Sequence, residues 1–173
     1  MEATAAIRPS REPTKADREL ALKLGSLMVH LLNPAGDSAF RVIDESGLTF
    51  VQTKGLITLA TTKSDHLSVK SLAEQLNISL PSASRAVDGL VRSKLASRDE
   101  DPDDRRARRV ALTAKGERLA QEIISARIEG IERFAATLAP DEREALAGAL
   151  DLLLEREEIA DTFRSHRARG RDR

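Results

Sequence analysis

Few residues in this chain of 173 could carry out chemistry, and their spacing excludes most catalytic and metal sites. His30, His66 and His166 stand alone, with no histidine or carboxylate three or four positions further on to complete a zinc site. There is no cysteine, so disulfides, thiolate ligands and thiol redox sensing are excluded. No phosphate-binding glycine loop, nucleophile elbow or catalytic carboxylate pair appears at a recognisable spacing. The sequence therefore predicts a protein that is not an enzyme and uses no metal or cofactor.

The remaining candidates are arginines, which bind phosphate groups or the edge of guanine. The chain has 28 basic and 28 acidic residues, so its formal net charge is zero, but the charges are unevenly placed. Residues 52–98 carry a net charge of +4, and four arginines fall within residues 105–109. Residues 119–163 carry −7 and residues 164–173 carry +4. This asymmetry indicates that one part of the chain meets a polyanion while another part has a different task.

Length and composition set the broad class. A chain of 173 residues suits one globular domain, and with four Phe, no Tyr and no Trp its core depends on aliphatic side chains. No apolar run approaches the roughly 20 residues that a membrane span needs, and residues 1–10 lack the apolar centre of a secretory signal. We therefore expect a cytoplasmic protein, with a disordered tail over residues 1–17 and a basic tail over residues 161–173.

Apolar periodicity indicates a mainly helical fold with one hairpin. Ser68 and Ser79 are predicted N-caps, and Asn77 between them suits the left-handed conformation that ends a helix. Two short helices around such a turn match a helix-turn-helix, and a hairpin directly after them is a wing. The predicted helices cover residues 20–32, 38–45, 50–62, 69–76, 80–94, 114–138 and 140–160, and the predicted strands cover residues 95–98 and 108–112.

The helix over residues 80–94 is the candidate for the helix that enters DNA. With Val87 inward, a spacing of 100° per residue puts the opposite face on Pro81, Ser82, Arg85, Gly89 and Arg92. Short side chains allow close approach to a major groove, and an arginine reaches guanine O6 and N7. An ordinary solvated helix face has the same composition, so the pattern alone leaves both interpretations open.

The predicted wing tip carries Asp104, Arg105 and Arg106. Arginines on a two-stranded arm suit a narrow minor groove. The alternative is a salt-bridged surface loop, in which the neighbouring acidic residues neutralise the arginines.

Here the sequence resembles a known family. The segment LSVKSLAEQLNISLPSASRAVDGLVRSKLASR, followed by DPDDRRARRVALTAKGERL, is similar to the winged helix-turn-helix core of MarR/SlyA-type transcriptional regulators. The most specific part is DDRRARRVALTAKG, and the resemblance extends over about residues 18–160. It implies a homodimer that binds a pseudo-palindromic operator in double-stranded DNA, usually as a repressor. Such proteins are often released from DNA by a small aromatic or phenolic effector.

The resemblance also assigns roles to individual residues. It places the groove-facing positions on Pro81, Ser82, Ser84 and Arg85. It places the minor-groove arginine on Arg105, with Arg106 beside it and Asp104 orienting it. Arg92 is added to the predicted DNA-binding residues because it lies on the helix face opposite Val87. The chain departs from the family at Leu80 and Gly89, where a polar or basic residue is common, and at Ala139, where a serine cap is usual. No ligand-binding residue is predicted.

The terminal helices are expected to form a dimer. Ile124, Ile128, Ile131, Ala135 and Leu138 recur in steps of four and three, which suits a helix packed along others. The resemblance implies that residues 18–48 and 119–160 form a helical dimerisation region around a winged helix-turn-helix domain at residues 49–118. Two alternatives remain at this point: a monomeric helical bundle, and a winged-helix protein-interaction module without sequence-specific DNA binding.

Overall fold

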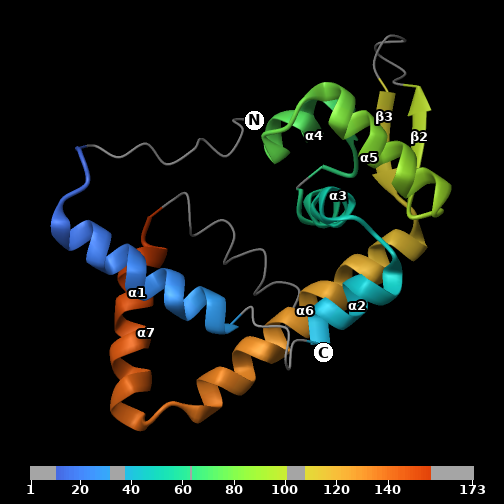
Figure 1. Cartoon of the computed structure of the whole chain (residues 1–173). Coiled ribbons are helices and arrows are strands. Elements are labelled where there is room, and N and C mark those ends of the chain that lie inside the picture. The colour runs from blue at the N-terminus through green and yellow to red at the C-terminus, as the bar shows by residue number, and fades with distance from the viewer. Residues whose placement is uncertain (1–10, 32–37, 63, 101–107, 157–173) are drawn as a thin grey trace. The chain divides into compact units, whose positions relative to one another are not determined.

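The computed structural model describes residues 11–31, 38–62, 64–100 and 108–156, and it confirms the mainly helical fold class (Figure 1). The chain divides into two compact units, residues 1–130 and 131–173. The elements of the first unit and the helix that leads out of it are α1 (Lys15–Leu31), α2 (Ser38–Ser46), α3 (Phe50–Thr61), β1 (Leu67–Ser68), α4 (Val69–Leu76), α5 (Leu80–Arg92), β2 (Ala96–Glu100), β3 (Arg108–Leu112) and α6 (Ala114–Thr137). The second unit contains α7 (Pro140–Leu154).

A small aliphatic core holds the winged-helix part together. Helices α3, α4 and α5 contact one another, and each of them also contacts a strand of the small sheet (Figure 1). The side chains at the centre of this core are fully buried: Leu56, Leu72, Val87, Leu90 and Val110. Burying a side chain of this size stabilises the fold by about 1.5–3 kcal/mol, so these few residues fix how the three helices pack.

The sheet has one more strand than the sequence predicts. Its three strands are antiparallel in the order β1-β3-β2. The hairpin pairs Ala96 with Leu112 at one end and Glu100 with Arg108 at the other, so the predicted wing strands are confirmed. The additional strand β1 pairs Leu67 with Val110. A strand of two residues is too short to show an alternating pattern, and its existence depends on a partner more than forty positions away.

Local capping agrees with the sequence predictions. Thr49, Ser68 and Ser79 are the N-caps of α3, α4 and α5, each accepting a hydrogen bond from a backbone N–H of the first turn. Asn77 ends α4 in the left-handed conformation, with φ of 53°. These side chains satisfy amides that the helix itself leaves free, which is why polar residues mark the boundaries.

The first half of helix α6 contributes to the winged-helix core. This half buries Gly116, Ala120 and Ile123, and Ile123 is part of the winged-helix core. The stripe predicted for packing along other helices begins one residue later, at Ile124, which is half-buried in the single chain. The two stripes are one residue apart on the same helix, so the periodicity alone does not decide which one faces the core.

Helix α7 begins where the sequence predicts but ends earlier. Ala139 offers no capping side chain, as predicted, but the Glu142 carboxylate accepts a hydrogen bond of 2.8 Å from the Ala139 backbone N–H. The helix ends at Leu154, six residues before the predicted end. None of its residues is buried, and three leucines are exposed: Leu150, Leu152 and Leu153.

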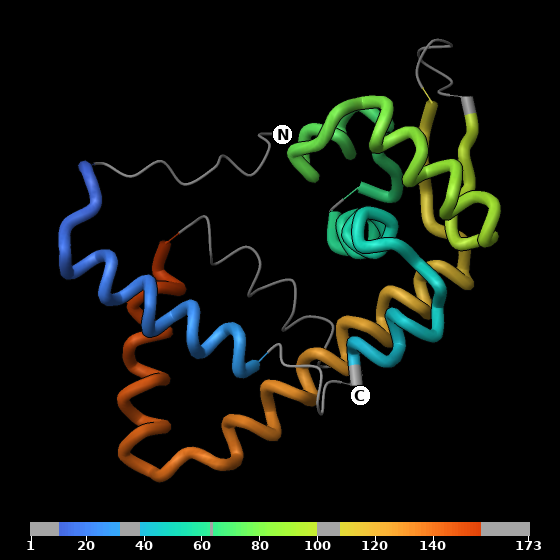
Figure 2. Tube along the Cα trace, in the orientation of Figure 1, coloured from blue at the N-terminus to red at the C-terminus, as the bar shows by residue number. Residues whose placement is uncertain are grey.

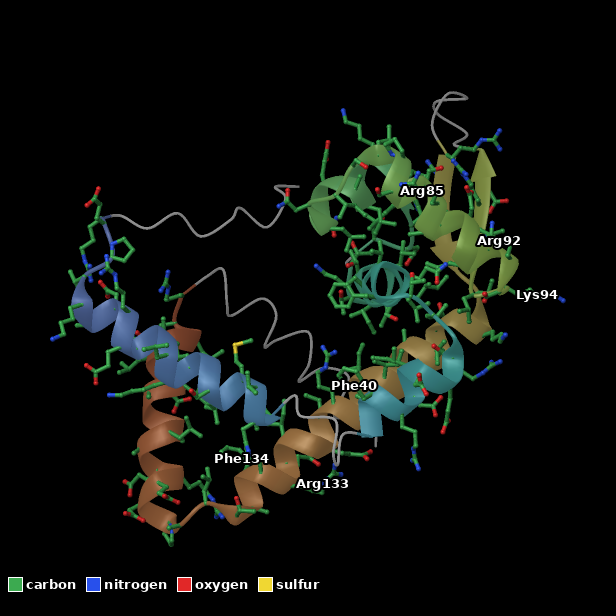
Figure 3. All side chains as sticks on the ribbon, viewed as in Figure 1. Phe40, Arg85, Arg92, Lys94, Arg133 and Phe134 are labelled. Carbon is green, nitrogen blue, oxygen red and sulfur yellow. The ribbon has the colours of Figure 1, made fainter. Side chains whose placement is uncertain are left out.

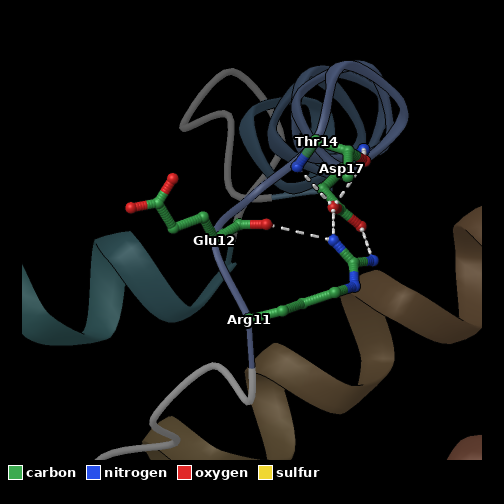
Figure 4. Close-up of polar contacts among 4 residues, drawn as sticks. All are labelled: Arg11, Glu12, Thr14 and Asp17. Atoms are coloured by element: carbon green, nitrogen blue, oxygen red, sulfur yellow. Dashed lines mark hydrogen bonds and ion pairs between the residues drawn. The ribbon is translucent and has the colours of Figure 1, made fainter.

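The start of α1 lies inside the segment that the sequence predicts as a disordered tail. Thr14 and Asp17 bond to each other through side chain and backbone, which caps the helix at Lys15 (Figure 4). Arg11 forms a two-pronged ion pair with the same carboxylate. The Arg11 guanidinium and then the two Thr14 hydrogen bonds hold the pKa of the Asp17 carboxyl well below its ordinary value.

This cap gives α1 a defined response to acid. Because the pKa of Asp17 is lowered in the folded chain, its contribution is complete above the ordinary aspartate value of about 3.9 and is lost as the pH falls through the lower folded value. In an NMR titration, the Thr14 amide shift should stay constant down to about pH 4 and change only well below it. In Arg11→Ala the change should move to higher pH. An Asp17 that titrates near 3.9 in the unmodified chain would contradict the cap.

Candidate nucleic-acid interface

The candidate interface is built on α5, which follows α4 after a tight turn (Figure 2). The turn is closed by a hydrogen bond of 3.0 Å from the Ile78 N–H to the Ala73 carbonyl. Ser79 then caps α5, and its hydroxyl lies 2.9 Å from that of Ser82. Two short helices joined in this way form a helix-turn-helix, the arrangement predicted from the sequence.

One face of α5 is buried and another is exposed. Val87 is fully buried, as predicted, and so is Leu90, whereas Val91 is exposed. On the other side Arg85 and Arg92 are exposed, with Lys94 just beyond the helix end (Figure 3). The remaining predicted residues are placed as follows: Pro81 is exposed, and Ser82 and Ser84 are half-buried.

Arg85 is supported by its own helix. Its Nη2 donates to the Ser82 hydroxyl over 3.2 Å, so the cap at Ser79, the hydroxyl of Ser82 and the guanidinium form one chain of contacts. A guanidinium carries five N–H groups, and the contact with Ser82 uses one of them, so the others can bind another molecule. An exposed arginine held in this way can bind a phosphate or the acceptor pair on guanine.

Gly89 does not lie on the exposed face, and the prediction that placed it there was wrong. It is buried, and an added Cβ would overlap the side-chain amide of Gln52 on α3. The error comes from the width of the buried face: α5 packs against α3 as well as α4, so more than one stripe of the helix is covered.

The wing is joined to α5 by an ion pair that the sequence did not reveal. Arg98 on β2 donates from Nη1 to Asp88 Oδ1 over 2.9 Å, and both side chains are partly buried. The predicted wing-tip residues Asp104, Arg105 and Arg106 lie outside the described residues, in the segment that links Glu100 to Arg108. The hairpin stem that leads to this segment is therefore tied to the middle of α5.

The start of α6 is hydrogen-bonded to the residues at the end of α5. The Thr113 hydroxyl donates to the Lys94 carbonyl over 2.8 Å, and the Thr113 N–H donates to Leu95 O over 3.1 Å. Lys115 Nζ donates to the Ser93 carbonyl over 3.2 Å. The three carbonyl groups belong to the residues that directly follow α5, which ends at Arg92, so the bonds hold this part of the chain against the start of α6. They also hold the end of α5 in place relative to the start of α6.

Metal chemistry has no support in the described part of the chain. Residues 11–31, 38–62, 64–100 and 108–156 contain no group of three His, Cys, Asp or Glu side chains that could hold a metal ion. His30 and His66 lie on separate elements, and His166 falls outside the described residues. Among the same described residues, no helix is both long enough and apolar enough to pass through a bilayer.

Comparison with known proteins agrees with this geometry. Residues 46–107 match the family model described as the MarR family. RV1404 from Mycobacterium tuberculosis is 26% identical with a TM-score of 0.68, covering 84% of this chain and 95% of its own. A MarR transcriptional regulator from Methanosarcina mazei Go1 is 25% identical with a TM-score of 0.57, covering 78% and 95%. No curated protein matches the chain.

A third solved structure contains DNA. A variant of MepR from S. aureus, bound to an oligodeoxyribonucleotide, is 24% identical to this chain with a TM-score of 0.59. The similarity covers 78% of this chain and 96% of that one. At this identity the comparison shows that the two proteins share a fold.

The ion pair between Asp88 and Arg98 should couple the wing to α5 energetically. In a double-mutant cycle with Asp88→Ala and Arg98→Ala, we expect a coupling of about 1 kcal/mol, the upper end for exposed pairs, because both groups are partly desolvated. The matched control is the exposed pair Lys70 and Glu74 on α4, whose coupling should be about 0.3–0.5 kcal/mol. Urea unfolding measures both, and equal couplings would contradict the assignment.

The close packing of α6 against the residues that follow α5 leaves no room for a side chain at Gly116. An added Cβ would overlap the Leu95 carbonyl oxygen, which is backbone and cannot swing aside. Gly116→Ala should therefore lower the free energy of unfolding by roughly 1–3 kcal/mol. Gly148→Ala on α7 is the control, because nothing lies within 4 Å of the new methyl there. It should raise helix stability by about 0.5–1 kcal/mol. A Gly116→Ala chain as stable as the parent would refute the close contact.

Proposed function

We propose that this protein is a transcription regulator that binds a specific sequence in double-stranded DNA, a proposal supported by the match of residues 46–107 to the model of the MarR family. The observation that carries the proposal is the exposed Arg85 on the outer face of α5, a helix whose inner face is locked in the core. Such a helix can enter a major groove, and an arginine there binds guanine O6 and N7 in a bidentate manner. The DNA held by the MepR variant supports the same use of this fold.

The wing supplies the second DNA contact in this proposal. Arg105, with Arg106 beside it and Asp104 orienting it, is proposed to enter the adjacent minor groove. The tie between Asp88 and Arg98 supports this, because it keeps the hairpin stem at a set angle to α5. Pro81, Ser82 and Ser84 allow the helix to approach the bases closely, and Arg92 is proposed to meet a phosphate.

We propose that the active form is a homodimer. Helix α1 has no buried residue, and Leu20, Leu24 and Met28 recur along it at a spacing of four with about half of each side chain exposed. The leucines of α7 are exposed as well. Apolar surface of this extent on two helices suits a subunit interface. A two-fold dimer places two copies of α5 about 34 Å apart, on successive major grooves of one face of DNA.

Repression, relieved by a small organic effector, is the regulatory mode that we propose from the family. An aromatic or phenolic effector would find few aromatic partners, since the chain has four Phe and no Tyr or Trp. The absence of cysteine excludes a thiol as the sensor.

The proposal is tested by selecting bound duplexes from a random library with the purified protein. We expect a palindrome whose half-sites lie about one helical turn apart, because a two-fold dimer presents two identical reading heads. Affinity for the selected duplex should fall steeply with salt, because each neutralised phosphate releases a counterion. No enriched sequence, together with binding that hardly responds to salt, would instead indicate a protein-interaction module.

Arg85 is expected to carry most of the base readout by hydrogen bonds. Arg85→Ala should weaken binding to the selected duplex by about 1–3 kcal/mol and relax the preference at one base pair of each half-site. Fluorescence anisotropy on a panel of single-base variants measures both effects. Arg127→Ala removes the same charge from the exposed surface of α6 and should leave the preference intact. If Arg85→Ala keeps the full affinity and the full preference, the role given to Arg85 is wrong.

A further inference from the structure

The first turn of α5 exposes apolar surface that neither the core nor the arginine contact explains. Leu80 is 52% exposed, and Pro81 beside it is also exposed. Within residues 64–100, the one other exposed large apolar side chain is Val91, in the last turn of the same helix. Leu80 therefore contributes little to the core, although it stands in the part of the chain that is packed most closely.

The polar groups of this turn are already engaged within the helix. The Ser79 hydroxyl accepts from the Ser82 backbone N–H and contacts the Ser82 hydroxyl. The Ser82 hydroxyl in turn accepts from Arg85. With these hydroxyl groups serving as cap and support, the outward surface of the turn is aliphatic, and it ends at the guanidinium of Arg85.

Only one base offers a matching surface in the major groove. Thymine presents its C5 methyl group there, whereas adenine and cytosine present amino groups and guanine presents two acceptors. An aliphatic side chain against an amino group or an acceptor would leave that polar group without a partner, which costs affinity. In helix-turn-helix proteins, the N-terminal residues of the recognition helix are the ones that contact base edges.

We propose that Leu80 and Pro81 are specificity-determining residues that pack against thymine methyl groups of the operator. This inference rests on the proposed function. Five residues of helix, about 7.5 Å along its axis, separate Leu80 from Arg85. The thymine and the guanine bound by Arg85 therefore belong to the same half-site.

Deoxyuridine tests the contact directly, because it differs from thymidine by the methyl group alone. The probe is the duplex recovered from the random library, with each thymine of the half-site replaced in turn by deoxyuridine. At one or two positions the unmodified protein should bind about fourfold more weakly per half-site, the value of one buried methyl group. In Leu80→Ala, the same replacement should change the affinity less than twofold.

Matched variants separate readout from folding. Val91→Ala shortens the other exposed aliphatic side chain of α5 and should leave the response to deoxyuridine unchanged. Pro81→Ala should reduce the response without abolishing it. The deoxyuridine scan of the unmodified protein needs no variant. It therefore shows whether thymine methyl groups are contacted even if Leu80→Ala lowers the melting temperature.

The outcomes distinguish the inference from the function on which it rests. Specific binding with no thymine sensitive to loss of its methyl, or a response that persists in full in Leu80→Ala, overturns the apolar readout and leaves the regulator intact. The absence of any sequence-specific binding overturns both. A lost response in Leu80→Ala, kept in Val91→Ala, supports the contact.

Discussion

The burial of one face of α5 is the constraint on which the rest of the interface depends. Val87 and Leu90 are fully buried among Leu56 and Leu72, so the helix cannot rotate without exposing apolar surface to water. A helix with one face fixed in this way presents its other face by necessity, and Arg85 lies there. The exposure of the candidate reading residues therefore follows from the packing of residues that never meet DNA.

Packing of its apolar face fixes the rotation of α5 about its own axis. Polar contacts at its first turn, its middle and its end fix the place of the helix in the fold. Ser79 caps the first turn, and Asp88 in the middle forms an ion pair with Arg98 on β2. Just after the last turn, the carbonyl groups of Ser93 and Lys94 accept hydrogen bonds from Lys115 and Thr113. The Ser79 cap lies within α5, whereas the other two sets of contacts join α5 and the residues directly after it to β2 and to the start of α6, so a shift of the helix would break at least one of them. A reading head held before it meets a ligand loses less entropy on binding, which favours affinity and discrimination together.

Signals that lie next to one another in the sequence predicted most of this fold. Ser68, Asn77 and Ser79 mark helix ends through contacts within a few residues, and the structure has those ends where they were expected. Features that depend on distant partners were missed: β1 needs Val110, the placement of Gly89 needs Gln52, and Ile123 needs the whole core. Asp88 and Arg98 are both visible as charges, but only the path of the hairpin brings them within 2.9 Å.

The neutral net charge constrains how this interface can work. A strongly basic protein gains affinity for any duplex through counterion release, whatever the sequence. This chain balances 28 basic residues with 28 acidic ones, and residues 119–163 alone carry −7, so its net charge adds no general attraction to DNA. In the proposed function, discrimination between sequences therefore rests on short-range contacts of a few side chains on α5 and the wing. A surface that combines one arginine, held by Ser82, with exposed aliphatic groups fits that requirement, because each contact favours binding to one base and disfavours binding to the others.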